Sequence, residues 1–189
     1  NRLLDKIAEF AEENNIKLAI NAGTTAIKKG EVYFKKIIDA SNIFILNKEE
    51  ASMLTKISVR PDTKTEFFSK EKIHPDMVEM FKILRKDNDA IIIITDGKNG
   101  AIAYDGKNYY KAPEFPAKVT STLGAGDAFS STFVAAMEKY NNDIEKAIKA
   151  ASVNSASVVE VFGAQEGLIS FDKIEEKLKN HPDYRIEII

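Results

Sequence analysis

The sequence predicts an α/β fold, in which a largely parallel sheet carries helices on both faces. Short apolar segments alternate with amphipathic segments of helical length, which is the pattern of repeated β-α-β units. The strongest strand candidate, residues 90–95, is a continuous apolar and mostly β-branched run, as expected of a strand covered on both faces. A chain of 189 residues fits a single domain with a full core, residues 1–189.

The first half of the chain alternates helix and strand signals, separated by Asn-rich and Gly-rich turns. In chain order we expect a helix over 3–11, a strand over 16–20, a helix over 32–38, a strand over 42–46 and a helix over 48–54. Residues 56–73 carry many charges and little periodicity, so they predict a surface loop. His74-Pro75-Asp76 then begins another helix, because proline is well tolerated in a first helical turn.

The second half changes its hydrophobic period after the strand over 90–95. Residues 101–104 and 108–112 alternate around Asp105-Gly106, which is the pattern of a β-hairpin. The remaining expected elements are a helix over 124–140, a helix from Asp143 to 161, a helix over 171–178 capped by Ser170, and an edge strand over 184–188.

Composition indicates a globular protein without nucleic-acid or membrane partners. Charged residues make up 30% of the chain with a net charge of -2, and the two signs are mixed, so no basic stripe is available for nucleic acid. The apolar runs are far shorter than the roughly 18 residues that span a bilayer. Cysteine is absent, which excludes disulfides and fits a cytoplasmic location. Phosphate-loop, protein-kinase and Rossmann glycine patterns are also missing from the sequence.

The segment Gly124-Ala125-Gly126-Asp127 is the strongest candidate for a chemical site. Two glycines at a helix start let several backbone N–H groups converge where the helix dipole is positive, which suits a phosphate. A carboxylate beside them can accept the proton of an attacking hydroxyl during phosphoryl transfer. From the residues alone, an aspartate that only caps or complements the helix is an equally good interpretation.

Two further loops follow strands, where open α/β sheets bind their ligands. The loop after residues 90–95 can seat a nucleotide, although an ordinary turn into a hairpin has the same pattern. Its residues are Thr95, Asp96, Gly97, Lys98, Asn99 and Gly100. Asn47 and Glu50 follow the preceding strand. They can contact phosphate and order water around Mg²⁺, or they can form only a capping box.

Taken together, these segments resemble the ribokinase-like family, also called the pfkB carbohydrate kinases. The run from Ser121 to Phe129 is similar to the C-terminal signature of the family. The supporting motifs follow in family order and are Asn21-x-Gly23, Asn47-x-x-Glu50, Thr95-x-Gly97-x-x-Gly100 and Gly163-Ala164. The resemblance covers nearly the whole chain, onto roughly the C-terminal two thirds of a typical member. It implies a ribokinase-like fold that lacks the N-terminal lid portion.

The resemblance implies ATP-dependent phosphorylation of a hydroxymethyl group on a sugar or a nucleoside. Asp127 would be the general base, and the anion hole would be formed by the N–H groups of Gly124, Ala125 and Gly126. The nucleotide would be contacted by Asn47 at its phosphates, by Thr95 to Gly100 along its ribose and phosphates, and by Ser152 near adenine, or by Asn154 if the helix is shifted. Glu50 would bind Mg²⁺ through water.

Many members of the family also hold a potassium ion beside the anion hole. The loop positions implied for it here are Ser121, Leu123, Val158, Val161, Gly163 and Gly167. The family often carries aspartate where this chain has Ser121, and a serine cannot supply that charge, so potassium activation is in doubt. Thr132 is a second departure, because a smaller residue is usual at its position.

The N-terminal part of the family, with its lid and most sugar-binding residues, is not recognisable in this sequence. We therefore expect a fragment that holds nucleotide and base and that turns over poorly alone. The alternative hypothesis is a non-catalytic nucleotide-binding or interaction module without an acceptor site. A truncated sheet exposes an edge and apolar surface, so we also expect either a homodimer or low solubility.

Overall fold

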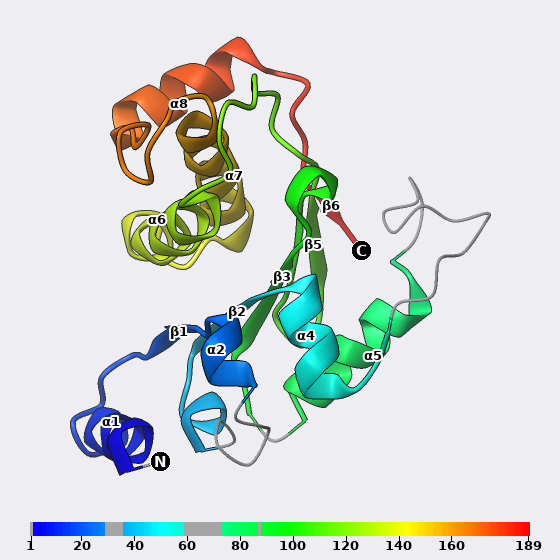
Figure 1. The fold of residues 1–189 in the computed structure, drawn as a ribbon, viewed down its shortest axis with the longest axis vertical. Helices are drawn as coiled ribbons and strands as arrows, with labels where there is room; N and C mark the ends of the chain where they lie inside the picture. Colours follow the sequence, from blue (N-terminus) through cyan, green and yellow to red (C-terminus); the bar gives the residue numbers. More distant parts are fainter. Residues whose placement is uncertain (1, 29–35, 59–72, 87) are drawn as a thin grey trace. The chain divides into compact units, whose positions relative to one another are not determined.

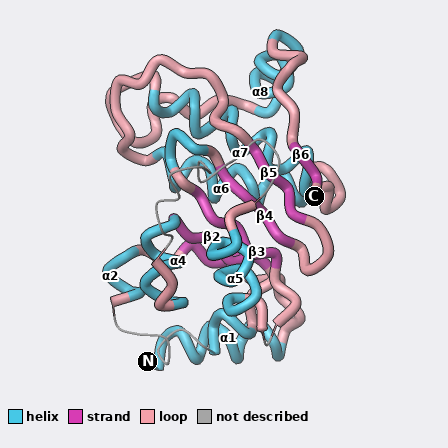
Figure 2. Tube along the Cα trace, turned by 90° about the vertical axis from the view of Figure 1, so that its right-hand side faces the viewer, coloured by secondary structure: helices cyan, strands magenta, loops and turns pink. Residues whose placement is uncertain are grey.

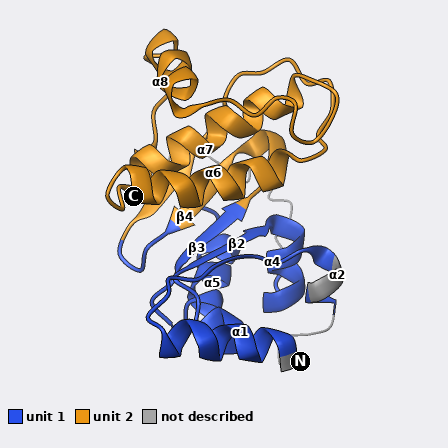
Figure 3. Cartoon of the chain, turned by 90° about the vertical axis from the view of Figure 1, so that its left-hand side faces the viewer, with its two compact units in different colours: residues 1–94, 104–107 blue, residues 95–103, 108–189 orange. Residues whose placement is uncertain are grey.

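The computed structural model of the chain describes residues 2–28, 36–58, 73–86 and 88–189 (Figure 1). Its six strands form one sheet in the order β1-β2-β3-β4-β5-β6, and the α/β fold class predicted from the sequence is confirmed. The sheet is mixed, with parallel pairing of β1 and β2 and antiparallel pairing of β5 and β6. The chain divides into two compact units, residues 1–94 with 104–107 and residues 95–103 with 108–189 (Figure 3). Compact units of this kind can belong to one domain or to two, so the single domain expected over residues 1–189 stays a prediction.

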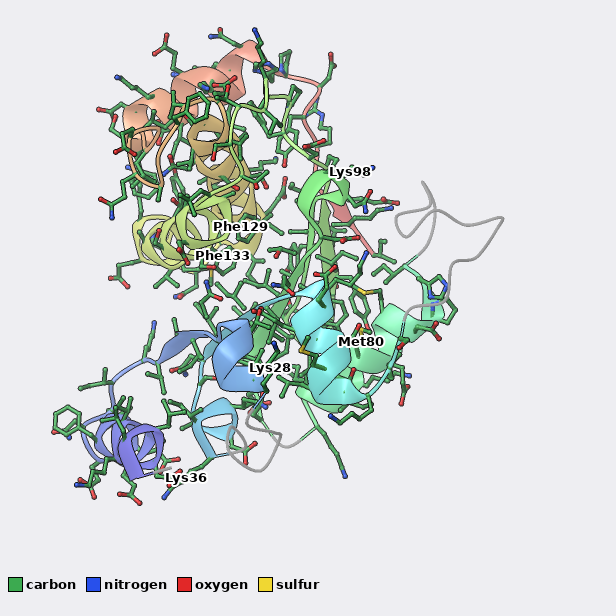
Figure 4. The ribbon with its side chains drawn as sticks, in the orientation of Figure 1. Lys28, Lys36, Met80, Lys98, Phe129 and Phe133 are labelled. Atoms are coloured by element: carbon green, nitrogen blue, oxygen red, sulfur yellow. The ribbon has the colours of Figure 1, made fainter. Side chains whose placement is uncertain are left out.

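The first unit is built on the N-terminal strands of the sheet. Its elements are α1 (Arg2–Glu13), β1 (Ala19–Asn21), α2 (Thr24–Ile27), β2 (Ile43–Asn47), α4 (Lys48–Thr55), α5 (Pro75–Leu84) and β3 (Ile91–Thr95). The three central residues of β2 and of β3 are all buried, as expected for strands covered on both faces. Met77, Met80 and Phe81 give α5 a fully buried side, on which Figure 4 labels Met80.

The N-terminal predictions need two corrections. The first strand begins at Ala19 and not at residue 16, because Ile16 still donates its N–H to Ala11 O at the end of α1. Apolar spacing along α1 predicted one buried face, but only Ala8 and Ala11 are buried, whereas Leu3 is 65% exposed. The helix expected over 32–38 lies partly outside the described residues, within which residues 36–39 are helical. Most of the loop expected over 56–73 is also outside them.

The second unit contains the hairpin and the C-terminal helices. Its elements are the 3-10 turn η1 (Gly97–Asn99), β4 (Ala101–Tyr104), β5 (Tyr109–Ala112), α6 (Ala125–Lys139), α7 (Ile144–Val159), α8 (Phe171–Asn180) and β6 (Glu187–Ile188), and Figure 2 shows its strands. Helices α6 and α7 pack against each other, and Phe129 and Phe133 of α6 are buried (Figure 4). In α7, Ala147 and Ala151 are fully buried, and such small side chains allow the two helices to approach closely.

The helix caps explain where these helices begin. Asp143 accepts a hydrogen bond from the Lys146 N–H at 3.0 Å, as its place before α7 predicts. Partial burial is the largest single influence on the pKa of Asp143, and it raises that pKa. Hydrogen bonds from the N–H groups of Lys146 and Glu145, together with the Lys146 side chain, outweigh it, so the pKa of Asp143 is lowered overall. Ser170 occupies the N-cap of α8 as predicted, although its side chain makes no capping hydrogen bond with the described residues.

The C-terminus returns from α8 to the sheet. Strand β6 pairs with β5, with Tyr110 opposite Ile188 and Lys111 opposite Glu187, which confirms the predicted edge strand in a shorter form. Lys111 Nζ lies 3.3 Å from Glu187 Oε2, and this ion pair reinforces the register. Upstream, the Tyr184 hydroxyl donates to Pro113 O at 2.9 Å. Within the described residues, every helix is too short or too polar for a membrane crossing.

Candidate active site

The turn that opens α6 requires glycine at its first position. Gly124 has φ 80, in the left-handed region, and its carbonyl accepts the Ala128 N–H at 2.8 Å. A Cβ on Gly124 would lie 2.5 Å from Ala164 O and 2.8 Å from Ala164 Cα. The backbone of Gly124 therefore packs directly on the Gly163-Ala164 loop, and only a residue without a side chain fits there.

Backbone donors are available at this turn. The N–H groups of Gly124, Gly126 and Asp127 have no acceptor anywhere in the part of the chain that the structure describes. The Ala125 N–H, which the resemblance placed in the anion hole, donates instead to Thr122 O at 3.3 Å. Gly126 and Asp127 are also exposed. The start of α6 thus combines three unpaired donors with the positive end of the helix dipole, which is an arrangement that attracts an anion.

Asp127 does not serve as a side-chain cap for this helix. The N-cap is Gly124, which has no capping side chain, and Asp127 is the third residue of α6. Among the described residues, none donates a hydrogen bond to its carboxylate or forms an ion pair with it. The exposed carboxylate therefore keeps all its acceptor capacity beside the unpaired N–H groups. A role in complementing the helix dipole remains compatible with this position.

Three segments of the second unit converge around the turn. The N–H groups of Thr120 and Ser121 donate to Val159 O at 2.7 and 3.1 Å. A Cβ on Gly167 would lie 2.5 Å from Ser157 O and 2.6 Å from Val158 Cα, so residues 163–167 pack closely on the end of α7. These contacts join segments 120–124, 157–161 and 163–167. The segments carry all the positions implied for potassium, namely Ser121, Leu123, Val158, Val161, Gly163 and Gly167.

Two of these positions have a visible local role. The Ser121 hydroxyl accepts the Leu123 N–H at 3.3 Å, so it is fastened within its own turn. Gly163 has φ 111, and the Glu166 carboxylate occupies the place that a Cβ there would take. Hydrogen bonds from the N–H groups of Gln165 and Glu166 lower the pKa of the Glu166 carboxyl. No cluster of three acidic or histidine side chains that could bind a metal occurs in the described ranges.

The two candidates for adenine contact lie on the buried side of α7. The Ser152 hydroxyl donates to Ile148 O at 2.8 Å within the helix, and it also lies against the Tyr184 phenol. The Asn154 amide donates to Thr132 Oγ1 at 2.8 Å and accepts the Ile169 N–H at 3.0 Å. Asn154 therefore joins α7 to α6 and to the segment before α8, and it explains why a hydroxyl is useful at Thr132. Contact of either residue with adenine stays a prediction.

The loop from Thr95 to Gly100 forms a tight turn between β3 and β4. The Asp96 N–H donates to Gly100 O at 2.8 Å, and the Asn99 amide donates to Asp96 Oδ2 at 2.8 Å. Gly100 has φ 88 and packs against the backbone of Ala112, so a side chain has no room there. Lys98 is exposed on this turn (Figure 4). The loop therefore has the form of the ordinary turn into a hairpin, which was the alternative interpretation of its sequence, and nucleotide contact by the loop stays a prediction.

Asn47 and Glu50, in the first unit, form the capping box that their spacing predicts. The Glu50 N–H donates to Asn47 Oδ1 at 2.8 Å, and the Asn47 N–H donates to Glu50 Oε2 at 2.9 Å. The other carboxylate oxygen of Glu50 accepts the Thr24 hydroxyl at 2.9 Å. Glu50 is only 5% exposed. Its structural role is therefore present, and a role toward Mg²⁺ stays a prediction.

Sequence reasoning missed a group of serines around the first turn of α6. The hydroxyls of Ser155, Ser130 and Ser131 donate to the carbonyls of Ala125, Gly126 and Asp127, at 3.0, 2.8 and 2.7 Å. The signal was readable for Ser130 and Ser131, because a serine can bond the carbonyl four residues earlier in a helix. Ser155 lies on α7 and becomes a partner only through tertiary packing.

Residues 2–170 match the family described as pfkB family carbohydrate kinase. A ribokinase of Lactococcus lactis subsp. lactis is 29% identical over 173 residues, which cover 92% of this chain and 49% of that protein. A nucleoside kinase of Methanocaldococcus jannaschii is 27% identical over 180 residues, covering 93% of this chain and 51% of that protein.

Two solved structures share the fold. The nucleoside kinase of Methanocaldococcus jannaschii has a TM-score of 0.68 and 24% identity, covering 87% of this chain and 48% of its own. The nucleoside kinase of Burkholderia thailandensis, solved with inosine, has a TM-score of 0.74 and 16% identity, covering 96% and 54%. The chain spans about half the length of these relatives. Because the family match includes α6, α7 and the loops that surround the turn at Gly124, the chain belongs to the pfkB family of carbohydrate kinases.

Proposed function

We propose that this chain provides the phosphate-binding turn and the general base of an ATP-dependent kinase acting on a hydroxymethyl group of a sugar or nucleoside. One observation carries the proposal: three N–H groups without acceptors, at Gly124, Gly126 and Asp127, adjoin a carboxylate without partners among the described residues. Family membership supplies the reaction class, since the relatives named above are ribose and nucleoside kinases.

In the proposed reaction, Asp127 accepts the proton of the acceptor hydroxyl as its oxygen attacks the γ-phosphorus of ATP. The new oxygen–phosphorus bond forms while the bond between the γ-phosphorus and the ADP oxygen breaks, and the proton passes from Asp127 to solvent. The N–H groups at the start of α6 face the charge that spreads over the transferring phosphoryl oxygens. Such fixed dipoles stabilise the transition state without reorganising during the reaction.

Nucleotide and Mg²⁺ contacts belong to the same proposal. The Thr95–Gly100 turn and Ser152 are assigned to the nucleotide. Ser152 is preferred over Asn154 because its hydroxyl, which donates to Ile148 O, keeps acceptor lone pairs, whereas the nitrogen and the oxygen of the Asn154 amide are both bonded, to Thr132 and Ile169. Asn47 is assigned to the phosphates. Each Glu50 oxygen accepts one hydrogen bond and retains another lone pair, so its donor set suits the hydration shell of Mg²⁺. The bound ion would neutralise phosphate charge.

A potassium ion is the last part of the assignment. The six implied positions lie on three segments that contact one another, and their backbone carbonyl oxygens are the ligand type that K⁺ prefers. Ser121 brings a neutral hydroxyl to a position where the family often has a carboxylate. We therefore expect only weak activation by K⁺.

Replacing Asp127 with Asn in the complete gene product tests the proposal, because we expect the 189 residues to turn over poorly alone. Loss of the base should lower kcat for ribose or inosine phosphorylation by about 10²–10⁴-fold, while ATP affinity is largely kept. Asp172→Asn is the matched control, because Asp172 also lies in the first turn of an exposed helix and should leave kcat unchanged. Unchanged turnover in Asp127→Asn would refute the assignment. ATP binding without any wild-type turnover would instead favour a non-catalytic nucleotide-binding module.

We also infer a homodimer from the exposed apolar side of α1. Leu3 is 65% exposed and Phe10 is 60% exposed on this helix. Large apolar side chains grouped on one element favour association, because their burial removes apolar area from water. In sedimentation velocity we expect a dimer that Phe10→Ser shifts toward monomer and that Glu12→Ser, exposed on the opposite side of α1, does not. A wild-type protein that stays monomeric at about 100 µM would have a dimer dissociation constant above that concentration, which would contradict this inference.

A further inference from the structure

Three consecutive carbonyls in the first turn of α6 each accept a serine hydroxyl. Ser155 reaches Ala125 O at 3.0 Å, Ser130 reaches Gly126 O at 2.8 Å, and Ser131 reaches Asp127 O at 2.7 Å. Carbonyls this early in a helix already accept the intrahelical N–H bonds from the next turn. The serine hydroxyls therefore occupy the second lone pair of each oxygen.

Each of these carbonyls shares a peptide group with the next N–H along the chain. Ala125 O belongs to the same peptide as the Gly126 N–H, and Gly126 O belongs to the same peptide as the Asp127 N–H. Both of these N–H groups lack acceptors among the described residues. Asp127 O, by contrast, shares its peptide with the Ala128 N–H, which already donates to Gly124 O at 2.8 Å. Two of the three serines thus act on peptides whose donor is available to a ligand.

A hydrogen bond to a carbonyl polarises its peptide and makes the N–H of that peptide a stronger donor. We propose that Ser130 and Ser155 are positioning residues of the phosphate site, and that their hydroxyls orient and polarise the peptide groups presenting the Gly126 and Asp127 N–H to an anion. The proposal rests on the function proposed above and deepens it. Ser131 makes the same kind of bond without this consequence.

The surroundings of the two serines fix their hydroxyls in place. Ser130 is only 8% exposed, and Ser155 is half-buried. Ser155 comes from α7, which the Asn154 amide ties to Thr132 of α6 at 2.8 Å, one residue before Ser155 in the chain. The first turn of α6 is therefore held both from within its own helix and from its neighbour. This double attachment limits the directions in which its free N–H groups can point.

Binding of inorganic phosphate to the 189-residue protein tests the proposal, with ¹H–¹⁵N NMR of the Gly126 and Asp127 amides as readout. Ser130→Ala and Ser155→Ala should each weaken phosphate binding roughly twofold to fourfold, as expected if each bond strengthens a charge-assisted donor by about 10–30%. Ser131→Ala is the matched control and should leave the affinity unchanged. The conservative variants Ser130→Thr and Ser155→Thr keep a hydroxyl and should restore most of the affinity.

The same spectra without phosphate separate this proposal from the proposed function. Loss of the Ser130 hydroxyl should move the ¹⁵N resonance of Asp127 to lower frequency, and loss of the Ser155 hydroxyl should do so for Gly126. If these shifts occur but wild-type phosphate binding is absent at both amides, the anion-binding function fails while the polarisation stands. Unchanged ¹⁵N shifts overturn the proposal, as does an affinity loss in Ser131→Ala equal to that in the other two alanine variants.

Discussion

Replacing Gly124 with Ala should destabilise the protein far more than the same change at Gly126, although both glycines belong to one motif. Gly124 has φ 80, and an alanine in this left-handed conformation costs about 1–2 kcal/mol. Its Cβ would also lie 2.5 Å from Ala164 O and 2.8 Å from Ala164 Cα, which are backbone atoms and cannot rotate away. Such overpacking costs about 1–3 kcal/mol. We therefore expect Gly124→Ala to lower the free energy of unfolding by about 2–5 kcal/mol.

Gly126 provides the control for this experiment. It is inside α6, and a Cβ there would meet nothing within 4 Å. Alanine is the better helix former, so Gly126→Ala should leave the stability unchanged or raise it by up to about 1 kcal/mol. Urea unfolding followed by far-ultraviolet circular dichroism measures both variants at equilibrium. Equal midpoints for the two variants would refute the reasoning from the left-handed turn and its contact with Ala164.

Two further predictions concern the second unit. Asn154→Ala should lower the free energy of unfolding in urea by about 2–4 kcal/mol, because it leaves the buried Thr132 hydroxyl and the Ile169 N–H without their partner. A decrease below about 0.5 kcal/mol would contradict the role of Asn154 in joining these segments. Burial raises the pKa of Tyr184 to about 12, against a partial lowering by Ser152, so the folded state holds this proton at a pH where the unfolded chain, with a pKa near 10, releases it. Stability from Tyr184 should thus be present below pH 10 and be lost between about pH 10 and 12, by about 2 kcal/mol. Tyr184→Phe should reduce the decrease of stability with pH between about pH 10 and 12 without removing it, because burial and the Glu175 hydrogen bond also raise the pKa of Tyr140 to about 12. The same decrease in the variant and the wild type would count against the prediction.

Local signals in the sequence were enough to predict several features of the fold. Asn47 and Glu50 form their capping box from residues three apart, and Asp143 caps α7 through Lys146, so neither depends on distant packing. The turn at Gly124 was also identifiable, because its glycines, helix start and carboxylate are contiguous. Family membership rested on the order of such short segments, which a single sequence preserves.

Features set by distant contacts could not be predicted. The first strand starts at Ala19 partly because the Leu18 N–H donates to Asn42 Oδ1, a partner 24 residues away. The Ala125 N–H was expected to be a free donor at the start of α6, but it donates to Thr122 O. That hydrogen bond depends on the exact path of the turn, which a sequence does not specify. Ser155 and Ala125 are 30 residues apart, so their bond exists only because α7 packs on α6.

The two-residue strand β6 changes how this protein can be truncated or tagged. Strand β5 has four residues, and without β6 its backbone donors and acceptors would form an unprotected margin that can recruit strands from other molecules. Residues 187–189 cover this strand and leave a shorter exposed edge in its place. The ion pair of Lys111 with Glu187 and the two reciprocal backbone hydrogen bonds between Tyr109 and Ile189 hold these residues on β5. Removing them should promote aggregation, so purification tags that alter the C-terminus need a linker that leaves β6 paired.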